Sequence, residues 1–186
     1  RKKEGGFVSS FIWENFKPGT QINATGPHGD FCYSPIRDTK DIVCIAGGCG
    51  ITPFRSMIRE FAHNNEDINL TLLYGCKDLQ DVLFDDEING IIAANPEKYK
   101  RYNTFEKVAP GEECRQGFLD AAFIKDCVKD PQDKTYFICG PTVMYRFLKE
   151  EFNKVGVAEI KQTRYEVSGP PEQVVQYKGF PEELEG

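Results

Sequence analysis

The sequence predicts an α/β fold, with a five-stranded parallel sheet and helices on both of its faces. Two observations support this prediction. Short apolar runs typical of buried strands alternate with segments whose apolar residues recur at helical spacing. Several of these runs end in a glycine turn from which a helix starts, as in β–α–β units. The composition agrees, since 40% of the 186 residues are hydrophobic and 28% are charged.

The elements follow in order from the first apolar run. A buried strand is expected at 41–46 (DIVCIA), and a helix after it has Thr52 as its expected N-cap and Pro53 at its first position. The alternation then continues, and Asp120 is a candidate cap for a later helix. Further strands are predicted at 69–76, 102–108, 134–140 and 159–166, and further helices at 84–95, 119–130 and 141–156.

The turns after these strands are the expected place for a ligand. In an open parallel sheet the carboxyl ends of the strands share one edge, and ligands bind there. The turns at 47–52, 75–78 and 139–142 are therefore expected to lie along that edge.

Both ends of the chain depart from the alternation. Turn residues around the alternating QINAT (21–25) predict one strand with its loops, the last piece of a β-rich domain, whereas the proline- and acid-rich end predicts a tail or linker. We accordingly assign domains to 1–36, 37–167 and 168–186. The chain lacks a starting methionine, which we interpret as a cut from a longer protein.

Charge and cysteine usage exclude several functions. With a net charge of -6 and no basic cluster, nucleic-acid binding is not expected. No apolar run approaches the roughly 18 residues of a membrane span. The seven cysteines show no CxxC spacing, and although Cys44 and Cys49 are spaced like part of an iron–sulfur loop, no metal site is predicted. The total number of thiols is odd and four of them lie in or beside apolar runs, which predicts reduced cysteines and a cytoplasmic location.

The glycine turn in IAGGCGITPFRSM (45–57) is the first candidate site. Gly47, Gly48 and Gly50 let the backbone turn tightly and approach a ligand, and the following helix aims its N–H groups at that point. An anion such as a pyrophosphate fits this arrangement. The last glycine of the dinucleotide fingerprint is absent, however, so a tight strand–helix turn without a ligand remains an alternative.

Two further segments carry weaker signals. In FICGP, Cys139 ends a strand at the same edge, where its thiol lines a pocket for a flat ring or is simply a small buried hydrophobe. In GGFVSS (5–10), backbone amides and hydroxyls suit a second phosphate group, or Ser9 or Ser10 merely caps a helix. Taken alone, each segment favours its plainer reading, a small buried hydrophobe at Cys139 and a capped helix start at 5–10.

Taken together, five segments resemble one family. They are GGFVSS, PGTQINATGPHGDF, IAGGCGITPFRSM, LLYGCKDLQDVLFDDEI and YFICGPTVM. In this order, over residues 5–167, they resemble the ferredoxin–NADP reductase superfamily, and within it the NAD(P)H reductases of the phenol-hydroxylase-reductase type. The resemblance implies a Rossmann-like NAD(P)-binding domain and the terminal piece of a β-barrel flavin domain.

The resemblance also implies binding roles. The FAD pyrophosphate loop would be Gly6, Phe7, Val8 and Ser9, and the end of the flavin barrel would be Gly26, Pro27, Gly29 and Phe31. The NAD(P) pyrophosphate loop would be Gly47, Gly48, Gly50, Ile51, Thr52 and Pro53. The adenosine ribose would be read at Gly75, Cys76, Lys77 and Asp78, flanked by Phe84 and Glu87. The turn beside the nicotinamide would be Cys139, Gly140, Pro141 and Met144.

The implied activity is that of an NAD(P)H-oxidising flavoprotein reductase. Hydride would pass from nicotinamide to FAD, and electrons would pass on to an iron–sulfur centre or another accepting domain or protein. Cys139 would be the catalytic residue that orders the nicotinamide ring. Asp78 favours the 2′-hydroxyl of NADH and Lys77 the 2′-phosphate of NADPH, and we slightly favour NADH.

Other readings stay open. The tail resembles a linker that leads into a two-iron ferredoxin domain, so such a cluster is expected beyond it. The chain could instead be a non-catalytic nucleotide-sensing or electron-transfer subunit, or a domain that binds a nucleotide without redox chemistry. The sequence also predicts that Gly50→Val abolishes nucleotide binding while the fold is retained, because the side chain would take the place of the diphosphate.

Overall fold

The structure is a computed structural model that describes residues 2, 4–24, 29–157, 163–168 and 176–178. The chain forms two compact units, Arg1–Asp30 and Phe31–Gly186, and each is described by itself. The boundary between these two units lies before residue 31, whereas the sequence predicted a domain boundary after residue 36. Phe31 and Tyr33 pack against the core of the second unit, which explains why they group with it.

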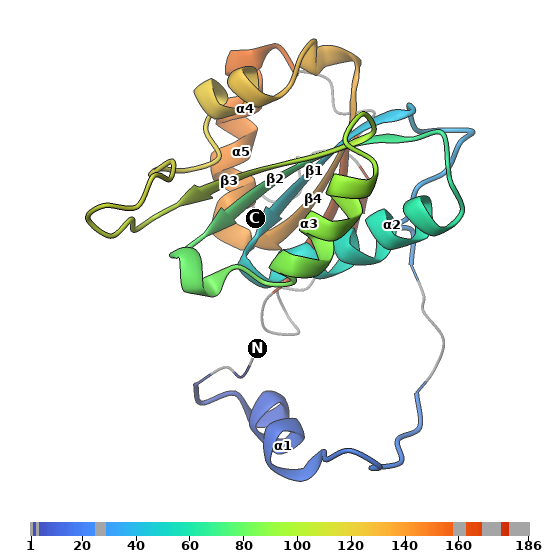
Figure 1. Cartoon of the computed structure of the whole chain (residues 1–186), viewed down its shortest axis with the longest axis vertical. Coiled ribbons are helices and arrows are strands. Elements are labelled where there is room, and N and C mark those ends of the chain that lie inside the picture. Colours follow the sequence, from blue (N-terminus) through green and yellow to red (C-terminus); the bar gives the residue numbers. More distant parts are fainter. Residues whose placement is uncertain (1, 3, 25–28, 158–162, 169–175, 179–186) are drawn as a thin grey trace. The chain divides into compact units, whose positions relative to one another are not determined.

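The second unit is built on one six-stranded sheet in the order β3-β2-β1-β4-β5-β6. Figure 1 shows β3, β2, β1 and β4 side by side in this order. Its strands are β1 (Asp41–Gly47), β2 (Asn69–Cys76), β3 (Tyr99–Phe105), β4 (Thr135–Pro141), β5 (Thr163–Ser168) and β6 (Gln176–Lys178). The first five run parallel to their neighbours, and β6 pairs antiparallel with β5. The helices are α2 (Thr52–His63), α3 (Asp85–Ala94), α4 (Ala121–Cys127) and α5 (Thr142–Val155).

The predicted α/β class with a parallel sheet is confirmed, but the predicted strand count of five is wrong. Four strands, β1 to β4, carry the described core, and the full sheet has six. The sixth, β6, lies in the stretch that was predicted to be a tail. Strand β6 forms by main-chain hydrogen bonding to β5. A short polar strand at the edge of a sheet shows no alternation of apolar and polar residues from which it could be predicted.

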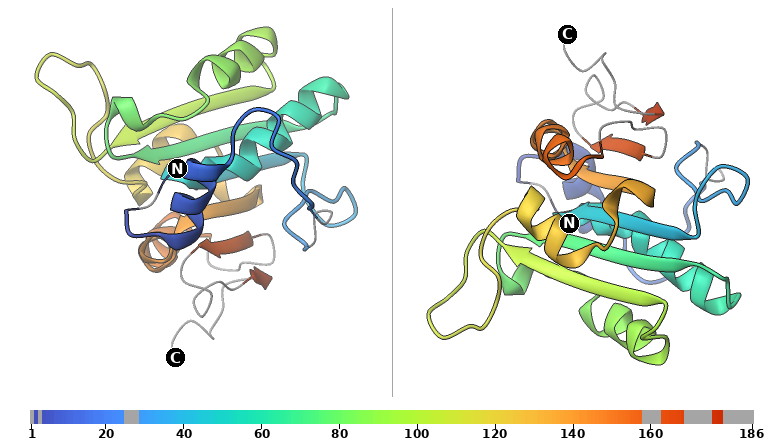
Figure 2. Two further views of the ribbon diagram at one scale, coloured as in Figure 1. Left: turned by 90° about the horizontal axis from the view of Figure 1, so that it is seen from below. Right: turned by 90° about the horizontal axis from the view of Figure 1, so that it is seen from above.

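Two hydrophobic clusters lie on the two faces of the sheet. Ile42, Cys44 and Ala46 of β1 belong to the cluster under α2 and α3. Val43 and Ile45 belong to the opposite cluster, under α4 and α5. Because both faces are covered (Figure 2), the central strand is a continuous apolar run rather than an alternating one.

The predicted helix caps have mixed outcomes. The Asp120 prediction is confirmed, because its carboxylate accepts a hydrogen bond from the N–H of Phe123 at 2.8 Å. The Thr52 prediction is wrong. A 3₁₀ turn, η1 (Gly48–Ile51), leads directly into α2, so the N-cap position falls on Ile51 and the Thr52 hydroxyl donates to the carbonyl of Cys49 at 3.1 Å instead.

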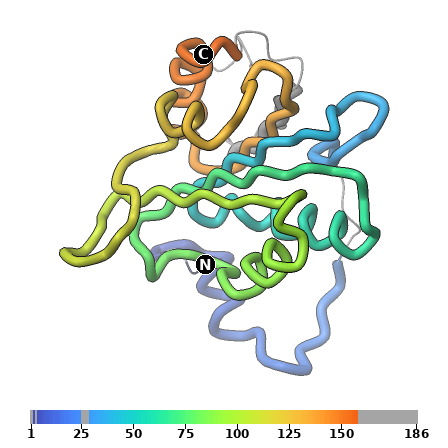
Figure 3. Tube along the Cα trace, turned by 45° about the horizontal axis from the view of Figure 1, so that its top comes forward, coloured from blue at the N-terminus to red at the C-terminus, as the bar shows by residue number. Residues whose placement is uncertain are grey.

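A long loop connects β3 to α4 and runs out from the body of the unit (Figure 3). It returns to the end of β3, where the N–H of Phe105 donates to the carbonyl of Arg115 at 3.0 Å. The N–H of Gly117 then donates to the carbonyl of Phe105 at 2.8 Å. These two bonds fix the point from which α4 begins.

Glu151 of α5 is a buried carboxylate that ties α5 to the start of α4. Its Oε2 atom accepts a hydrogen bond from the N–H of Ala121 at 2.7 Å, and Lys154 donates to Oε1 at 2.5 Å. The side chain is only 7% exposed. The hydrogen bond from Lys154, with that from Ala121, holds the pKa of Glu151 below its ordinary value of 4.5.

This arrangement predicts an acid-sensitive fold. Since the pKa of Glu151 is lower in the folded than in the unfolded protein, its contribution to stability is full above about pH 4.5 and is lost as the pH falls through the folded pKa. We expect the free energy of unfolding, measured by urea titration, to fall less steeply below that pH in Glu151→Gln than in the unchanged protein. Parallel pH profiles for the two proteins would contradict this role.

The first unit contains one helix, α1 (Phe7–Asn15), with Gly6 at its N-cap. The strand predicted at QINAT is wrong over its described part, because Gln21–Ala24 adopt no strand. A strand needs a hydrogen-bonding partner, and the described residues of this unit include no other strand. Thr25 and the predicted barrel-end residues Gly26 and Pro27 lie outside the described residues.

Three further observations limit the chemistry of the chain. No helix among the described residues has both the length and the apolar character that crossing a membrane requires. No group of three or more His, Cys, Asp or Glu side chains within the described ranges is placed to hold a metal ion. All seven cysteines lie at described positions, and no disulfide joins any of them.

Candidate functional site

The turns after β1 and β4 meet at one edge of the sheet. The two strands are parallel neighbours, and Ala46 lies opposite Cys139 in their register. The glycine turn therefore begins beside the point where β4 passes into α5. On the other side of β1, Gly47 lies opposite Gly75 of β2, which brings the third predicted turn to the same edge.

Gly50 is where the two turns touch most closely. A Cβ atom built on Gly50 would lie 2.0 Å from the carbonyl oxygen of Cys139 and 2.5 Å from its carbonyl carbon. No side chain fits there without moving the backbone. The prediction for Gly50→Val is therefore corrected: the added side chain would strike the chain's own backbone, so the fold cannot be expected to survive unchanged.

Met144 fills the space between the two turns. A Cβ atom on Gly47 would lie 2.8 Å from the Met144 sulfur, and one on Gly140 would lie 2.4 Å from its terminal methyl carbon. The same added Cβ atom on Gly47 would lie 2.9 Å from the Cδ atom of Pro141. These glycines thus allow the two turns to pack side by side around a thioether.

Gly48 differs from the other glycines of the turn. Its φ is +53°, in the left-handed region, and a Cβ atom built there would meet nothing within 4 Å. The backbone is thus open on this side. The amino end of α2 follows directly, and a helix amino end favours an anion. An open glycine beside a helix amino end fits a pyrophosphate.

Cys76 is the last residue of β2 and Cys139 lies near the end of β4, on the other side of β1, and both side chains are buried. Burial raises the pKa of the Cys76 thiol to about 11, so it remains protonated near neutral pH. Cys76 is therefore a packing residue rather than a reactive one. Cys139 is 7% exposed and stands at the contact between the two turns, with its carbonyl facing Gly50.

The segment after β2 presents one cation and one acid. Lys77 is exposed and Asp78 is half-buried. The Asp78 carboxylate caps the short 3₁₀ turn η2 (Leu79–Asp81) by accepting from the N–H of Asp81 at 3.1 Å. One of its oxygens is therefore already engaged in shaping the turn. Gly75 packs against Leu119, whose Cδ1 atom would lie 3.2 Å from an added Cβ.

Sequence reasoning missed Arg55, which links α2 to the start of α3. Its Nε atom donates to Glu87 Oε2 at 2.6 Å and its Nη2 atom to Oε1 at 3.1 Å. Its guanidinium also lies 4.6 Å above the centre of the Phe84 ring. The sequence placed Phe84 and Glu87 beside the ribose turn, but an arginine on the polar face of a helix gives no sign of a partner 32 residues later.

The predicted FAD loop lies in the first unit. Gly6 caps α1, and the Ser9 hydroxyl donates to the Gly6 carbonyl at 3.3 Å. The side chains of Phe7 and Val8 are 85% and 65% exposed. The loop is thus a helix amino end with exposed apolar side chains, and its two predicted readings, phosphate loop or capped helix start, remain predictions.

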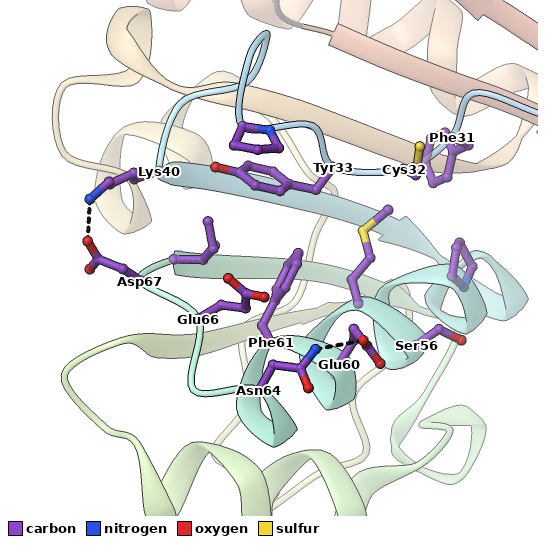
Figure 4. Close-up of a pocket in the computed structure, with 14 residues that line it drawn as sticks. Phe31, Cys32, Tyr33, Lys40, Ser56, Glu60, Phe61, Asn64, Glu66 and Asp67 are labelled. Carbon is purple, nitrogen blue, oxygen red and sulfur yellow. Dashed lines mark hydrogen bonds and ion pairs between the residues drawn. The ribbon is translucent and has the colours of Figure 1, made fainter.

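A groove of about 810 Å³ runs beside α2, between the loop at 31–40 and the loop at 64–68 (Figure 4). Phe31, Tyr33 and Phe61 form part of its wall. Of the predicted binding residues it contains only Phe31 and Pro53. The groove therefore lies apart from the edge where the three turns meet.

Comparison with known proteins agrees with this geometry. The sequence model of the family described as "Oxidoreductase NAD-binding domain" matches residues 44–150, which include both the glycine turn and the turn after β4. The chain is 27% identical over 175 residues to a flavohemoprotein of Rhodopirellula baltica, covering 91% of this chain and 42% of that protein. It is 31% identical over 162 residues to NADH-cytochrome b5 reductase 1 of Eremothecium gossypii, covering 85% of this chain and 56% of that protein.

A solved structure extends the likeness to three dimensions. The cytochrome b5 reductase domain of Ulva prolifera nitrate reductase superposes with a TM-score of 0.75 and 25% identity, covering 86% of this chain and 64% of that one. The chain spans about half the length of the curated relatives it matches.

The match over 44–150 settles the class of protein. The chain belongs to the oxidoreductase NAD-binding domain family, within the ferredoxin–NADP reductase superfamily. The predicted superfamily is thus confirmed, while the finer resemblance to the phenol-hydroxylase-reductase type stays a prediction.

Proposed function

We propose that the chain is the nucleotide-binding part of an NAD(P)H-oxidising flavoprotein reductase. The observation that carries the proposal is the meeting of the glycine turn and the Cys139 turn at one edge of the sheet, joined through Gly50 and Met144. The names of two relatives, an NADH-cytochrome b5 reductase and a flavohemoprotein, point to the same activity.

In this proposal each turn holds one part of the nucleotide. The open backbone at Gly48 and the amino end of α2 hold the pyrophosphate, with Gly47, Gly50, Ile51, Thr52 and Pro53 shaping the loop. The turn of Cys139, Gly140, Pro141 and Met144 borders the nicotinamide ring. When bound, the nicotinamide and the flavin supply hydride and electron transfer.

Cys139 orients the ring rather than attacking it. The carbonyl of Cys139 faces Gly50 and the Cys139 side chain is buried. The contact that joins the two turns therefore also fixes the position of Cys139. A fixed, weakly polar thiol suits van der Waals contact with a flat ring.

The ribose end of the nucleotide falls at Gly75–Asp78. The half-buried Asp78 has one carboxylate oxygen engaged at η2, which leaves the other to accept a hydrogen bond from a 2′-hydroxyl. We therefore favour NADH over NADPH, although the neighbouring exposed Lys77 has the charge to meet a 2′-phosphate.

The remaining parts of the proposal rest on the sequence alone. FAD is assigned to the loop of Gly6, Phe7, Val8 and Ser9, with the first unit as the end of a flavin domain and the second unit as the nucleotide domain. The electron acceptor is a further domain or protein, of which an iron–sulfur centre of the two-iron type is one example. A cytoplasmic location is part of the same proposal.

Spectroscopy of the natural protein that contains these residues tests the proposal. We expect a yellow protein whose flavin bands bleach when NADH, or less readily NADPH, is added without oxygen. Nucleotide binding without bleaching would favour the alternative, a non-catalytic nucleotide-sensing or electron-transfer subunit. Absence of binding by either nucleotide would overturn both.

A further inference from the structure

The contact of Arg55 with the start of α3 has no role in the proposed function so far. Arg55 lies in the first turn of α2, next to the proposed pyrophosphate loop. Its bidentate pair with Glu87, at 2.6 and 3.1 Å, reaches the first turn of α3, which follows the proposed ribose segment. One side chain therefore links the two elements that border the two halves of the nucleotide.

Arg55 also contacts Phe84, the residue directly before α3. Phe84 is a non-glycine residue in the left-handed region, with φ of 58° and ψ of 30°, a conformation that surrounding contacts must hold in place. The Arg55 guanidinium lies over its ring at 4.6 Å. Arg55 thus holds both the backbone turn that ends the 77–84 segment and the helix that follows it.

The other hydrogen bonds of this segment come from the segment itself, from its own strand, and from the residues after β3, where the N–H of Lys107 donates to the carbonyl of Lys77 at 2.9 Å. At its start Asp78 caps η2, and near its end the N–H of Leu83 donates to the hydroxyl of Tyr74 at 3.4 Å. None of these bonds relates the segment to α2. The polar contact from α2 comes from Arg55, together with the more exposed Arg59, whose Nε atom lies 3.3 Å from Glu87 Oε1. It adds to the apolar packing of Val82, Leu83 and Phe84 against the cluster to which α2 contributes.

Farther along the two helices, their outward faces diverge. A groove of about 920 Å³, with walls that include Arg59, His63, Gly90 and Ala94, separates α2 from α3. The polar contact at the amino ends therefore adds to the apolar packing that the two helices share, in which Ile88 of α3 lies in the same cluster as Phe54 of α2. Hydrogen bonding and charge from Arg55 lower the pKa of Glu87, so the carboxylate stays ionised, and the contact persists, to a lower pH than its ordinary pKa of 4.5 would allow.

We infer that Arg55 is a positioning residue that sets the distance between the pyrophosphate loop and the ribose segment, and so determines affinity for the adenosine half of the nucleotide. The inference rests on the proposed function. Arg55 does not touch the nucleotide in this account; it acts through Phe84 and Glu87. A planar, forked side chain is required, because a lysine can neither bind a carboxylate in two places nor stack on a ring in the same way.

The test compares two ligands on the 186-residue chain by isothermal titration calorimetry. Pyrophosphate alone engages only the glycine turn, whereas ADP-ribose engages both regions. For Arg55→Met we expect affinity for ADP-ribose to fall about fivefold. Affinity for pyrophosphate should stay within about twofold of the unchanged chain. Glu87→Gln should show the same pattern, and so should Arg55→Lys, because a lysine keeps the charge but neither pairs bidentately with the carboxylate nor stacks on the ring in the same way.

Arg59→Met is the matched control, since it also removes a cation from Glu87 but leaves the Phe84 contact in place. We expect both of its affinities to stay within about twofold of the unchanged chain. The inference is overturned if ADP-ribose affinity is retained in folded Arg55→Met or Arg55→Lys, or if both ligands weaken equally, since that would indicate a merely structural role. If the unchanged chain binds neither ligand, the proposed function fails first and the inference falls with it.

Discussion

Gly50→Ala is expected to destabilise the protein by about 3 kcal/mol or more, because a single added methyl group would overlap backbone atoms that have no room to move. The Cβ atom would lie 2.0 Å from the Cys139 carbonyl oxygen, and a carbonyl cannot rotate away as a side chain can. Separating the turns would pull the ends of β1 and β4 apart. Urea unfolding of the variant and of the unchanged protein measures the difference.

Gly48→Ala is the matched control, two residues away in the same turn. A Cβ atom there meets nothing within 4 Å, so its expected cost is only the strain of a left-handed alanine, about 1 kcal/mol. Equal stability of the two variants would show that the contact with Cys139 is not what requires glycine at position 50. Nucleotide binding should be lost with the fold in Gly50→Ala.

Phe152→Ala is expected to cost about 3–5 kcal/mol. The Phe152 ring is fully buried beneath α5 and packs edge-on against Tyr136 of β4, with ring centres 5.0 Å apart. Removing it leaves a cavity between the helix and the strand whose common turn carries Cys139. The thermal midpoint and the urea midpoint should both fall.

Phe118→Ala provides the comparison for this loss. Phe118 is 61% exposed, although its ring lies 6.1 Å from that of Phe147. Its truncation should change stability by no more than about 0.5 kcal/mol. If Phe152→Ala and Phe118→Ala lowered the free energy of unfolding by similar amounts, burial would not explain the contribution of Phe152 to stability.

The sequence predicted those features that short-range patterns encode. Alternating strand and helix periods gave the order from β1 to α5, and glycines after an apolar run located the turn at 47–52. The Asp120 cap was readable because a capping carboxylate bonds only a few residues along the chain. Because the strands are parallel, the meeting of the turns along one edge also followed from their order.

Most of the failures depend on contacts between residues far apart in the sequence, and the Thr52 cap is the local exception. The reason for glycine at position 50 is a carbonyl at position 139, and the glycine pattern alone could not distinguish that carbonyl from a ligand. Strand β6 depends on pairing with β5, and Thr52 lost its expected capping position to the 3₁₀ turn before it. Arg55 looked like a solvated helix residue because Glu87 is far away in sequence.

The contact between residues 50 and 139 treats its two partners unequally. At position 50 the absence of a side chain is what matters, whereas at position 139 only the main-chain carbonyl takes part. The thiol of Cys139 can therefore be exchanged for another small group in evolution without weakening the contact between the two turns, and in the proposed function such an exchange would change what meets the nicotinamide ring. Position 50 cannot vary in this way. The side chain at position 139 is free to change in chemistry, whereas position 50 must remain glycine to keep the two turns in contact.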